Sequence, residues 1–172
     1  QGPEFPVVDN DVQNELMAMD PLERLSSLDE LLLQAKGEKL PEEEEANGEM
    51  LQEASGWFQC DVHNLRILKA ITLDGLGQSQ EALSLWEESL LFVQENLPPM
   101  DESLIVLHSQ AALCCWSIDE VKARQHATAA VEFHDKLFGG GGVGWFRRRM
   151  KGDLELSLRP QQSAVDTLWP LS

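Results

Sequence analysis

The sequence predicts an all-α fold in which antiparallel helical hairpins stack side by side. Apolar residues recur at intervals of three and four, and glycine or proline residues separate these runs. No stretch before Gly139 alternates apolar and polar residues with the β-branched content of a strand. The chain has 172 residues, which is long enough for one domain with its own core.

Three regions are expected along the chain. Residues 1–5 resemble the remnant of a cleaved expression tag, and residues 6–138 are expected to form the helical domain. Within that domain, residues 41–48 include four consecutive glutamates and almost no apolar side chain, which predicts a solvated acidic loop. Residues 139–172 add a glycine-rich loop and a basic, aromatic segment.

The first predicted helix begins after Asp20. This carboxylate can cap the first turn, Pro21 suits the first helical position, and Glu23 completes the pattern of a capping box. Gly37 is expected to end the helix. Its expected apolar stripe comprises Leu22, Leu25, Leu28, Leu32 and Leu33.

Four further helices are predicted before the glycine-rich loop. The first ends at Gly75, and the second runs from about Ser79 to Asn96 because Pro98 cannot continue it. Asp101 and Asp119 begin the other two. The residues expected to face the core from these helices are Val62, Leu65, Leu68, Ile71, Leu73, Ala82, Leu83, Trp86, Leu90, Val93, Leu104, Leu107, Ala111, Leu113, Cys114, Val121, Ala127, Ala130, Val131 and Leu137.

The spacing within these paired helices carries a family resemblance. One copy, in residues 63–99, consists of Leu73, Gly77, Ala82, Trp86, Leu90 and Pro98. A weaker copy, in residues 104–138, consists of Ala111 or Ala112, Trp116, Ala123, Ala127 and Val131. Both resemble the tetratricopeptide repeat, whose unit is two antiparallel helices that cross closely at small residues. The sequence departs from that family at Lys69, where leucine is customary, and in a repeat longer than roughly 34 residues.

The resemblance implies a non-catalytic scaffold or adaptor that binds a peptide or helical segment of a partner protein. The expected groove lies between the helices near Leu73, Trp86 and Leu107, and Arg66 and Lys69 are counted among its residues. The main alternative is an accessory helical domain of a larger enzyme, which supplies placement and no chemistry.

Charge restricts the partners of this chain. Lys and Arg number 13 against 30 Asp and Glu, for a formal charge of −17. Residues 1–60 carry −12, residues 61–138 carry −7 and residues 139–172 carry +2. The acidic excess repels phosphate, so nucleic acid and anionic membranes are disfavoured, and a basic or apolar protein segment is the expected partner. No apolar run approaches a membrane span, and the three cysteines are too few for a disulfide framework, which favours the cytoplasm or nucleus.

No motif in the sequence indicates catalysis, a metal or a cofactor. Cys60 and His63 have a spacing that can chelate zinc, but the second tight ligand pair of a structural zinc site is missing. Cys114 with His108 is the only candidate nucleophile and base, and their six-residue separation places them on different faces of one helix. The chain is therefore expected not to be an enzyme and to hold neither metal nor cofactor.

The segment after Gly139 joins aromatic residues to cations. Its notable side chains are Trp145, Phe146, Arg147, Arg148, Arg149 and Lys151. Three interpretations remain open: a native segment that packs on the last helices, an engineered linker that tethers a partner peptide, or a basic patch that contacts nucleic acid. Beyond it, the alternation of Leu154, Leu156 and Leu158 resembles a strand, and residues 164–169 predict a short helix that caps the stack.

Overall fold

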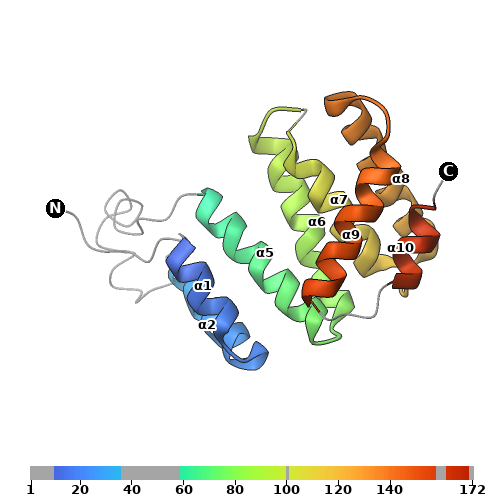
Figure 1. The fold of residues 1–172 in the computed structure, drawn as a ribbon. Coiled ribbons are helices and arrows are strands. Elements are labelled where there is room, and N and C mark those ends of the chain that lie inside the picture. The colour runs from blue at the N-terminus through green and yellow to red at the C-terminus, as the bar shows by residue number, and fades with distance from the viewer. Residues whose placement is uncertain (1–9, 36–58, 100, 158–161, 171–172) are drawn as a thin grey trace. The chain divides into compact units, whose positions relative to one another are not determined.

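The computed structural model describes residues 10–35, 59–99, 101–157 and 162–170, and these residues form helices joined by turns (Figure 1). The part of the chain that the structure describes is 85% helical and contains no strand, which confirms the predicted all-α class. The chain divides into two compact units, Gln1–Thr72 and Leu73–Ser172. The predicted loop at residues 41–48 and the helix end at Gly37 lie outside the described residues.

The first unit is built from α1 (Asn10–Ala18), α2 (Pro21–Ala35) and most of α5 (Gln59–Gly75). Its buried core residues are Leu16, Leu28, Ala35, Leu65 and Leu68. The predicted start of α2 is confirmed, because the Leu22 amide donates to Asp20 Oδ2 at 3.1 Å. Two residues of the predicted stripe are exposed, Leu22 at 64% and Leu33 at 50%.

Arg24 joins α2 to the end of α1, a helix that the sequence analysis missed. Its Nε donates to the Leu16 carbonyl at 2.9 Å, and its Nη2 donates to the Met19 carbonyl at 3.2 Å. A helix leaves its last carbonyls without partners, so this guanidinium satisfies groups at the α1 terminus. Nη1 also contacts Thr72 Oγ1 at 3.4 Å, which ties α5 into the same unit.

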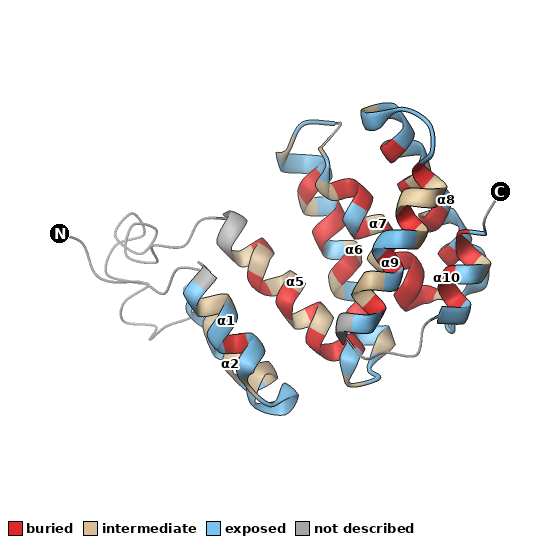
Figure 2. Ribbon diagram, in the orientation of Figure 1, coloured by how far each residue is buried: buried red, intermediate tan, exposed pale blue. Residues whose placement is uncertain are grey.

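The second unit contains α6 (Ser79–Asn96), α7 (Ser103–Cys115) and α8 (Glu120–Phe138), which pack in sequence as antiparallel neighbours. Asp119 caps α8 as predicted, accepting a hydrogen bond from the Lys122 amide at 3.1 Å. Several alanines of these three helices are buried, and a small side chain allows close approach of packed helices. The fully or nearly fully buried alanines of α6, α7 and α8 are Ala82, Ala111, Ala112, Ala123, Ala127 and Ala130. Most of α7 is buried (Figure 2). Val121, predicted to face the core, is 69% exposed.

The strand predicted at residues 154–158 is wrong for residues 154–157, the part of it that the structure describes. Leu154 lies in α9 (Gly142–Ser157), a helix that packs on α8. Phe146, Met150 and Leu154 recur every four residues, and all three are buried. This i, i+4 stripe explains why the segment is helical, because one helix face gains all the burial. A short helix, α10 (Gln162–Leu168), follows and packs on α7, α8 and α9.

Glycines make the turn between α8 and α9. Gly139 and Gly141 have φ angles of 86° and 92°, a region that residues with a side chain rarely adopt. At Gly142, an added Cβ would lie 2.8 Å from Asp135 Oδ1, so that carboxylate would have to move. The Gly142 amide instead donates to that oxygen at 3.3 Å. These constraints place α9 directly back against α8.

Phe146→Ala is expected to destabilise the protein by about 3–5 kcal/mol, because Phe146 is fully buried and stacks on Trp169 at 5.6 Å. The matched control is Phe138→Ala, whose ring is 58% exposed and which is expected to cost less than about 1 kcal/mol. Urea denaturation followed by tryptophan fluorescence and circular dichroism measures both. Equal, small effects of the two substitutions would show that α9 does not pack as described.

Candidate functional site

The apolar residues of the predicted groove are core residues. Leu73, Trp86 and Leu107 are 2%, 1% and 1% exposed. The prediction that they line an accessible groove is therefore wrong for this conformation, because the pattern that selected them marks the helix interface itself. Of the two cations assigned to the groove, Arg66 is half-buried, and Lys69 Nζ pairs with Asp29 Oδ1 at 2.8 Å inside the first unit.

The basic, aromatic segment belongs to the second unit. Phe146 is buried, and the half-buried Trp145 lies 4.8 Å from the His134 ring between centroids. Arg147 is tied to α10, since Nη1 donates to the Trp169 carbonyl at 2.9 Å and Nη2 pairs with Asp166 Oδ1 at 3.1 Å. These contacts anchor α10 to α9 within the chain.

The other cations of this segment lie on its solvent side. Arg149 pairs with Asp153 at 3.4 Å, one helical turn away on α9. Arg148 and Lys151 are exposed. Arg147 and Arg149 thus already have acidic partners in the same chain, which reduces the positive charge that the segment offers to a phosphate backbone.

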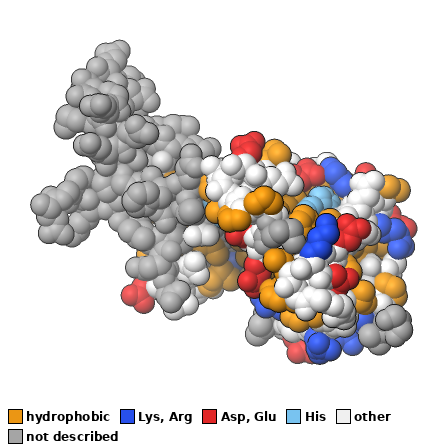
Figure 3. Space-filling view, turned by 90° about the horizontal axis from the view of Figure 1, so that it is seen from above, with side chains coloured by type: hydrophobic (Ala, Val, Ile, Leu, Met, Phe, Trp, Pro, Cys, Tyr) orange, Lys and Arg blue, Asp and Glu red, His pale blue; other side chains and the backbone are white. Residues whose placement is uncertain are grey.

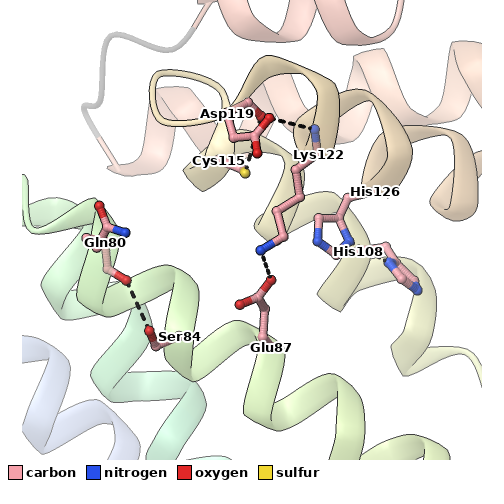
Figure 4. A network of polar contacts seen from close by, with 8 residues as sticks. All are labelled: Gln80, Ser84, Glu87, His108, Cys115, Asp119, Lys122 and His126. Atoms are coloured by element: carbon pink, nitrogen blue, oxygen red, sulfur yellow. Dashed lines mark hydrogen bonds and ion pairs between the residues drawn. The ribbon is translucent and has the colours of Figure 1, made fainter.

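Two histidines meet between α7 and α8. The Nδ1 atoms of His108 and His126 are 3.0 Å apart, so one nitrogen donates a proton and the other accepts it (Figure 4). Burial, helped by the charge of His126, lowers the pKa of His108 from 6.5 to about 4. Burial also lowers the pKa of His126, with Glu87 opposing and Lys122 reinforcing that shift. The pair is therefore neutral near pH 7.

An ion pair between α6 and α8 lies beside the histidines. Lys122 Nζ contacts Glu87 Oε2 at 2.7 Å, and this hydrogen bond and charge raise the pKa of Lys122 (Figure 4). Cys115 donates to the Asp119 carbonyl at 3.4 Å, and burial raises the pKa of its thiol. A protonated thiol is a poor nucleophile.

The candidate nucleophile and base lie in different interfaces. The Cys114 thiol donates to the Ser79 carbonyl at 3.0 Å, whereas the His108 ring faces His126 and stacks near Phe133. Within the described residues, no group of three or more His, Cys, Asp and Glu side chains is arranged to hold a metal ion. The side chain of Cys60, one of the two zinc candidates in α5, lies outside the described set.

The solvent face of α8 forms a shallow depression. Its volume is about 450 Å³, and its lining residues recur along one helical stripe: Val121, Arg124, Gln125, Thr128, Ala129 and Glu132. Val121 is the most exposed large apolar side chain among those described. Its apolar spacing predicts a core position for this valine, because spacing alone does not distinguish a buried stripe from an exposed one.

A second, more enclosed pocket lies where the ends of several helices meet. Its volume is about 330 Å³. Its lining residues come from the turn after α5, the end of α7 and the start of α10: Asp74, Gly75, Gly77, Ser79, Leu113, Cys114, Trp116, Ser117, Ser163 and Ala164. No local pattern in the sequence predicts this pocket, since its lining residues are spread from Asp74 to Ala164.

Comparisons of the sequence with protein family models and with curated proteins give no match, and no solved structure matches the chain. What can be said about function thus comes from the chain's own residues. Among the helices that the structure describes, none is both long enough and apolar enough to cross a membrane.

The histidine pair makes stability depend on pH. Because the pKa of His108 is lower in the folded protein than its ordinary 6.5, the unfolded chain binds protons more readily. Stability is therefore expected to be complete above pH 6.5 and to fall as pH drops toward 4. Urea midpoints measured at neutral and acidic pH should differ less for His108→Asn than for wild type. The non-titrating control Gln110→Asn should keep the wild-type difference, and an unchanged difference in His108→Asn would contradict the assignment.

Proposed function

We propose that this chain is a non-catalytic interaction scaffold of the tetratricopeptide type, which binds a helical or extended segment of a partner protein. The support from the fold is the sequential packing of α6, α7 and α8 and the burial of alanines in all three helices. In repeats of this kind, the hairpins supply a rigid support and the exposed helix faces supply the binding surface.

The observation that carries the proposal is the exposed stripe on α8. Its residues follow the i, i+3, i+4, i+7 spacing of a helix face, yet this face includes Val121 and Ala129 and forms a depression. A partner helix can lay an apolar stripe along it, which is the helix-in-groove mode of recognition. Covering an exposed valine contributes about 1–2 kcal/mol, so this side chain is the expected anchor.

The charge around the stripe indicates a partner with basic flanks. Arg124 is already paired with Glu120 at 3.1 Å, and Glu132 adds a further carboxylate. Residues 61–138 carry −7 overall. On the face seen in Figure 3, acidic and basic side chains are interspersed with apolar ones. The long-range attraction of a basic partner therefore comes from the net negative charge. Such attraction speeds encounter, while apolar burial provides most of the affinity.

The basic cluster on α9 gives less support to a nucleic-acid function. Arg147 and Arg149 pair with Asp166 and Asp153, and the whole chain carries −17. Phosphate binding requires cations that outweigh the surrounding negative charge. A role as the accessory domain of a larger enzyme is compatible with the scaffold proposal, since such a domain also acts by binding.

Selection of a displayed random-peptide library against the full chain tests the scaffold proposal. The selected peptides are expected to be amphipathic and net positive, and to bind less tightly as salt rises. Val121→Asp should weaken their binding at least about tenfold, because the substitution buries a charge in the contact. An aspartate in the first turn of α8 suits the helix dipole, so folding is preserved. Fluorescence anisotropy of the synthetic peptides measures the change.

The matched control for this test is Leu91→Asp. Leu91 is 57% exposed on α6, away from the α8 stripe, and its substitution should alter binding less than about twofold. Peptides that bind Val121→Asp as tightly as wild type would remove α8 as the binding surface. Failure to select any peptide that binds the chain would contradict the scaffold proposal itself.

A further inference from the structure

The start of α9 presents backbone donors that are not used in the fold. The glycine turn that leads into it, residues 139–141, is exposed (Figure 2). The first amides of a helix have no carbonyl partner inside that helix. The Gly142 amide donates to Asp135 Oδ1 at 3.3 Å. The amides of Val143 and Gly144 have no hydrogen-bond acceptor among the described residues, so they are available to a ligand.

A buried histidine faces the same turn. His134 is only 7% exposed, and its Nδ1 has no hydrogen-bond partner within the part of the chain that the structure describes. This nitrogen lies 3.0 Å from the position that a Cβ on Gly142 would occupy, so it is directed at the first residue of α9. The rings of Trp145 and Phe146 pack against the imidazole, at 4.8 Å and 5.7 Å between centroids. A buried polar atom without a partner is costly, so a bound group that pairs with it is stabilised.

An arginine lies beside the first turn of α9 on another side. Arg148 Nη1 is 3.6 Å from the position that a Cβ on Gly144 would occupy, so the guanidinium folds back along α9 toward its start. Arg148 is exposed and forms no ion pair with a described residue. Gly142 and Gly144 are separated by roughly 200° around the helix axis. His134 and Arg148 therefore flank the first turn from opposite sides, and the unused amides lie between them.

The charge near this turn favours an anion. Residues 136–151 contain five Lys or Arg and no Asp or Glu, although the whole chain carries −17. The N-terminus of α9 adds about half a positive charge. Arg147 and Arg149 are paired with carboxylates, whereas Lys151, like Arg148, has no ion-pair partner among the described residues. Charges more than roughly 8 Å away are largely screened at physiological ionic strength, so these nearby cations outweigh the distant acidic residues.

Asp135 is the acidic group that already lies at this turn. Its side chain is exposed and accepts one hydrogen bond, from the Gly142 amide, as a helix cap does. The turn thus accepts a negatively charged oxygen. A phosphate group carries more charge than a carboxylate and has more oxygens, so it can accept from several donors at once. The donors that Asp135 leaves unused match that requirement.

We propose that the start of α9 binds a single phosphate group through the amides of Val143 and Gly144, the His134 imidazole and the Arg148 guanidinium. Backbone amides at a helix N-terminus that follows a glycine-rich turn are suited to this ligand. One phosphate group needs only these local donors, whereas a nucleic-acid backbone needs a row of unpaired cations. The inference is independent of the scaffold proposal, because it uses no residue of the α8 stripe.

Titration of the full ¹⁵N-labelled chain with inorganic phosphate, at neutral pH and constant ionic strength, tests the site by NMR. The expected result is fast-exchange shifts of the Val143 and Gly144 amides and of the His134 imidazole nitrogens, with a dissociation constant of about 1–10 mM. The Gly77 amide, in the turn before α6, is the internal control and should not shift. Acetate has one carboxylate and should bind at least about fivefold more weakly than phosphate.

A parallel titration with N-acetyl-O-phosphoserine amide distinguishes the source of the phosphate group. The turn is exposed, so an ester can bind with its carbon side toward solvent. Tighter binding of the amide would assign the site to a phosphorylated side chain of another protein. Tighter binding of inorganic phosphate would assign it to the free ion, and both outcomes support the site.

Variants at exposed positions locate the binding without disturbing the core. Arg148→Gln should weaken phosphate binding at least about threefold. Lys151→Gln removes the same charge from an exposed position one turn further along α9, and it should change the affinity less than about 1.5-fold. Asp135→Asn keeps an acceptor for the Gly142 amide and removes the opposing charge, so phosphate should bind at least about threefold more tightly.

Three results would each overturn the proposal. The first is the absence of Val143 and Gly144 shifts up to about 50 mM of both phosphate ligands. The second is an equal loss of affinity in Arg148→Gln and Lys151→Gln. The third is an Asp135→Asn variant that binds phosphate no more tightly than wild type. Circular dichroism spectra identical to wild type establish that each variant is folded.

The failure of this inference is distinguishable from that of the scaffold. Val121→Asp, which tests the α8 stripe, should change phosphate binding less than about 1.5-fold. Selected peptides that depend on Val121, together with no phosphate binding, would leave the scaffold standing and remove this site. Phosphate binding without any selected peptide would contradict the scaffold alone.

Discussion

The second unit depends on the burial of α7. This helix is apolar on all sides, and its residues from Ala111 to Cys115 are buried without interruption. Such a helix is stable only when neighbours cover most of its surface, and α6, α8 and α10 pack against it, leaving Val106 41% exposed. Several of its polar groups have partners, because Ser109 Oγ donates to the Ile105 carbonyl at 2.8 Å and the thiols of Cys114 and Cys115 donate to the Ser79 and Asp119 carbonyls. The alanines of α8 allow the close approach that this covering requires.

The binding surface proposed on α8 follows from the same arrangement. With α7 in the centre, α8 must turn one face to its neighbours and the other to solvent, and the outward face carries the stripe that begins at Val121. The end of α7 is covered only partly by α10 and by the turn after α5, which leaves the pocket beside Trp116. The histidine pair lies deeper, between α7 and α8, where low polarity keeps both rings neutral. We therefore expect the histidine pair to affect the stability of the protein and the pH dependence of that stability, and not to contact a ligand.

The charge distribution favours a basic partner segment for the α8 surface. The acidic excess of the chain is concentrated before residue 61, residues 61–138 are moderately acidic, and the last segment is slightly basic. Within the second unit, the basic segment uses Arg147 to hold α10 through Asp166 and the Trp169 carbonyl. An arginine of this chain thus already joins a carboxylate and a carbonyl beside an aromatic cluster.

Local signals in the sequence determined the helix boundaries. These signals are Asp20 with Pro21 at the start of α2, Asp119 at the start of α8, and the proline after α6. Each acts within one or two turns of backbone, so its effect can be predicted without the rest of the fold. Which side of a helix is buried was decided only by its neighbours, which is why Leu22, Leu33 and Val121 were misplaced and Leu154 was read as part of a strand. The polar α1 was missed because its terminus is satisfied by Arg24 from the next helix. The contact between His108 and His126 and the pocket at Asp74 also required tertiary structure, since each joins residues from different helices that no local spacing relates.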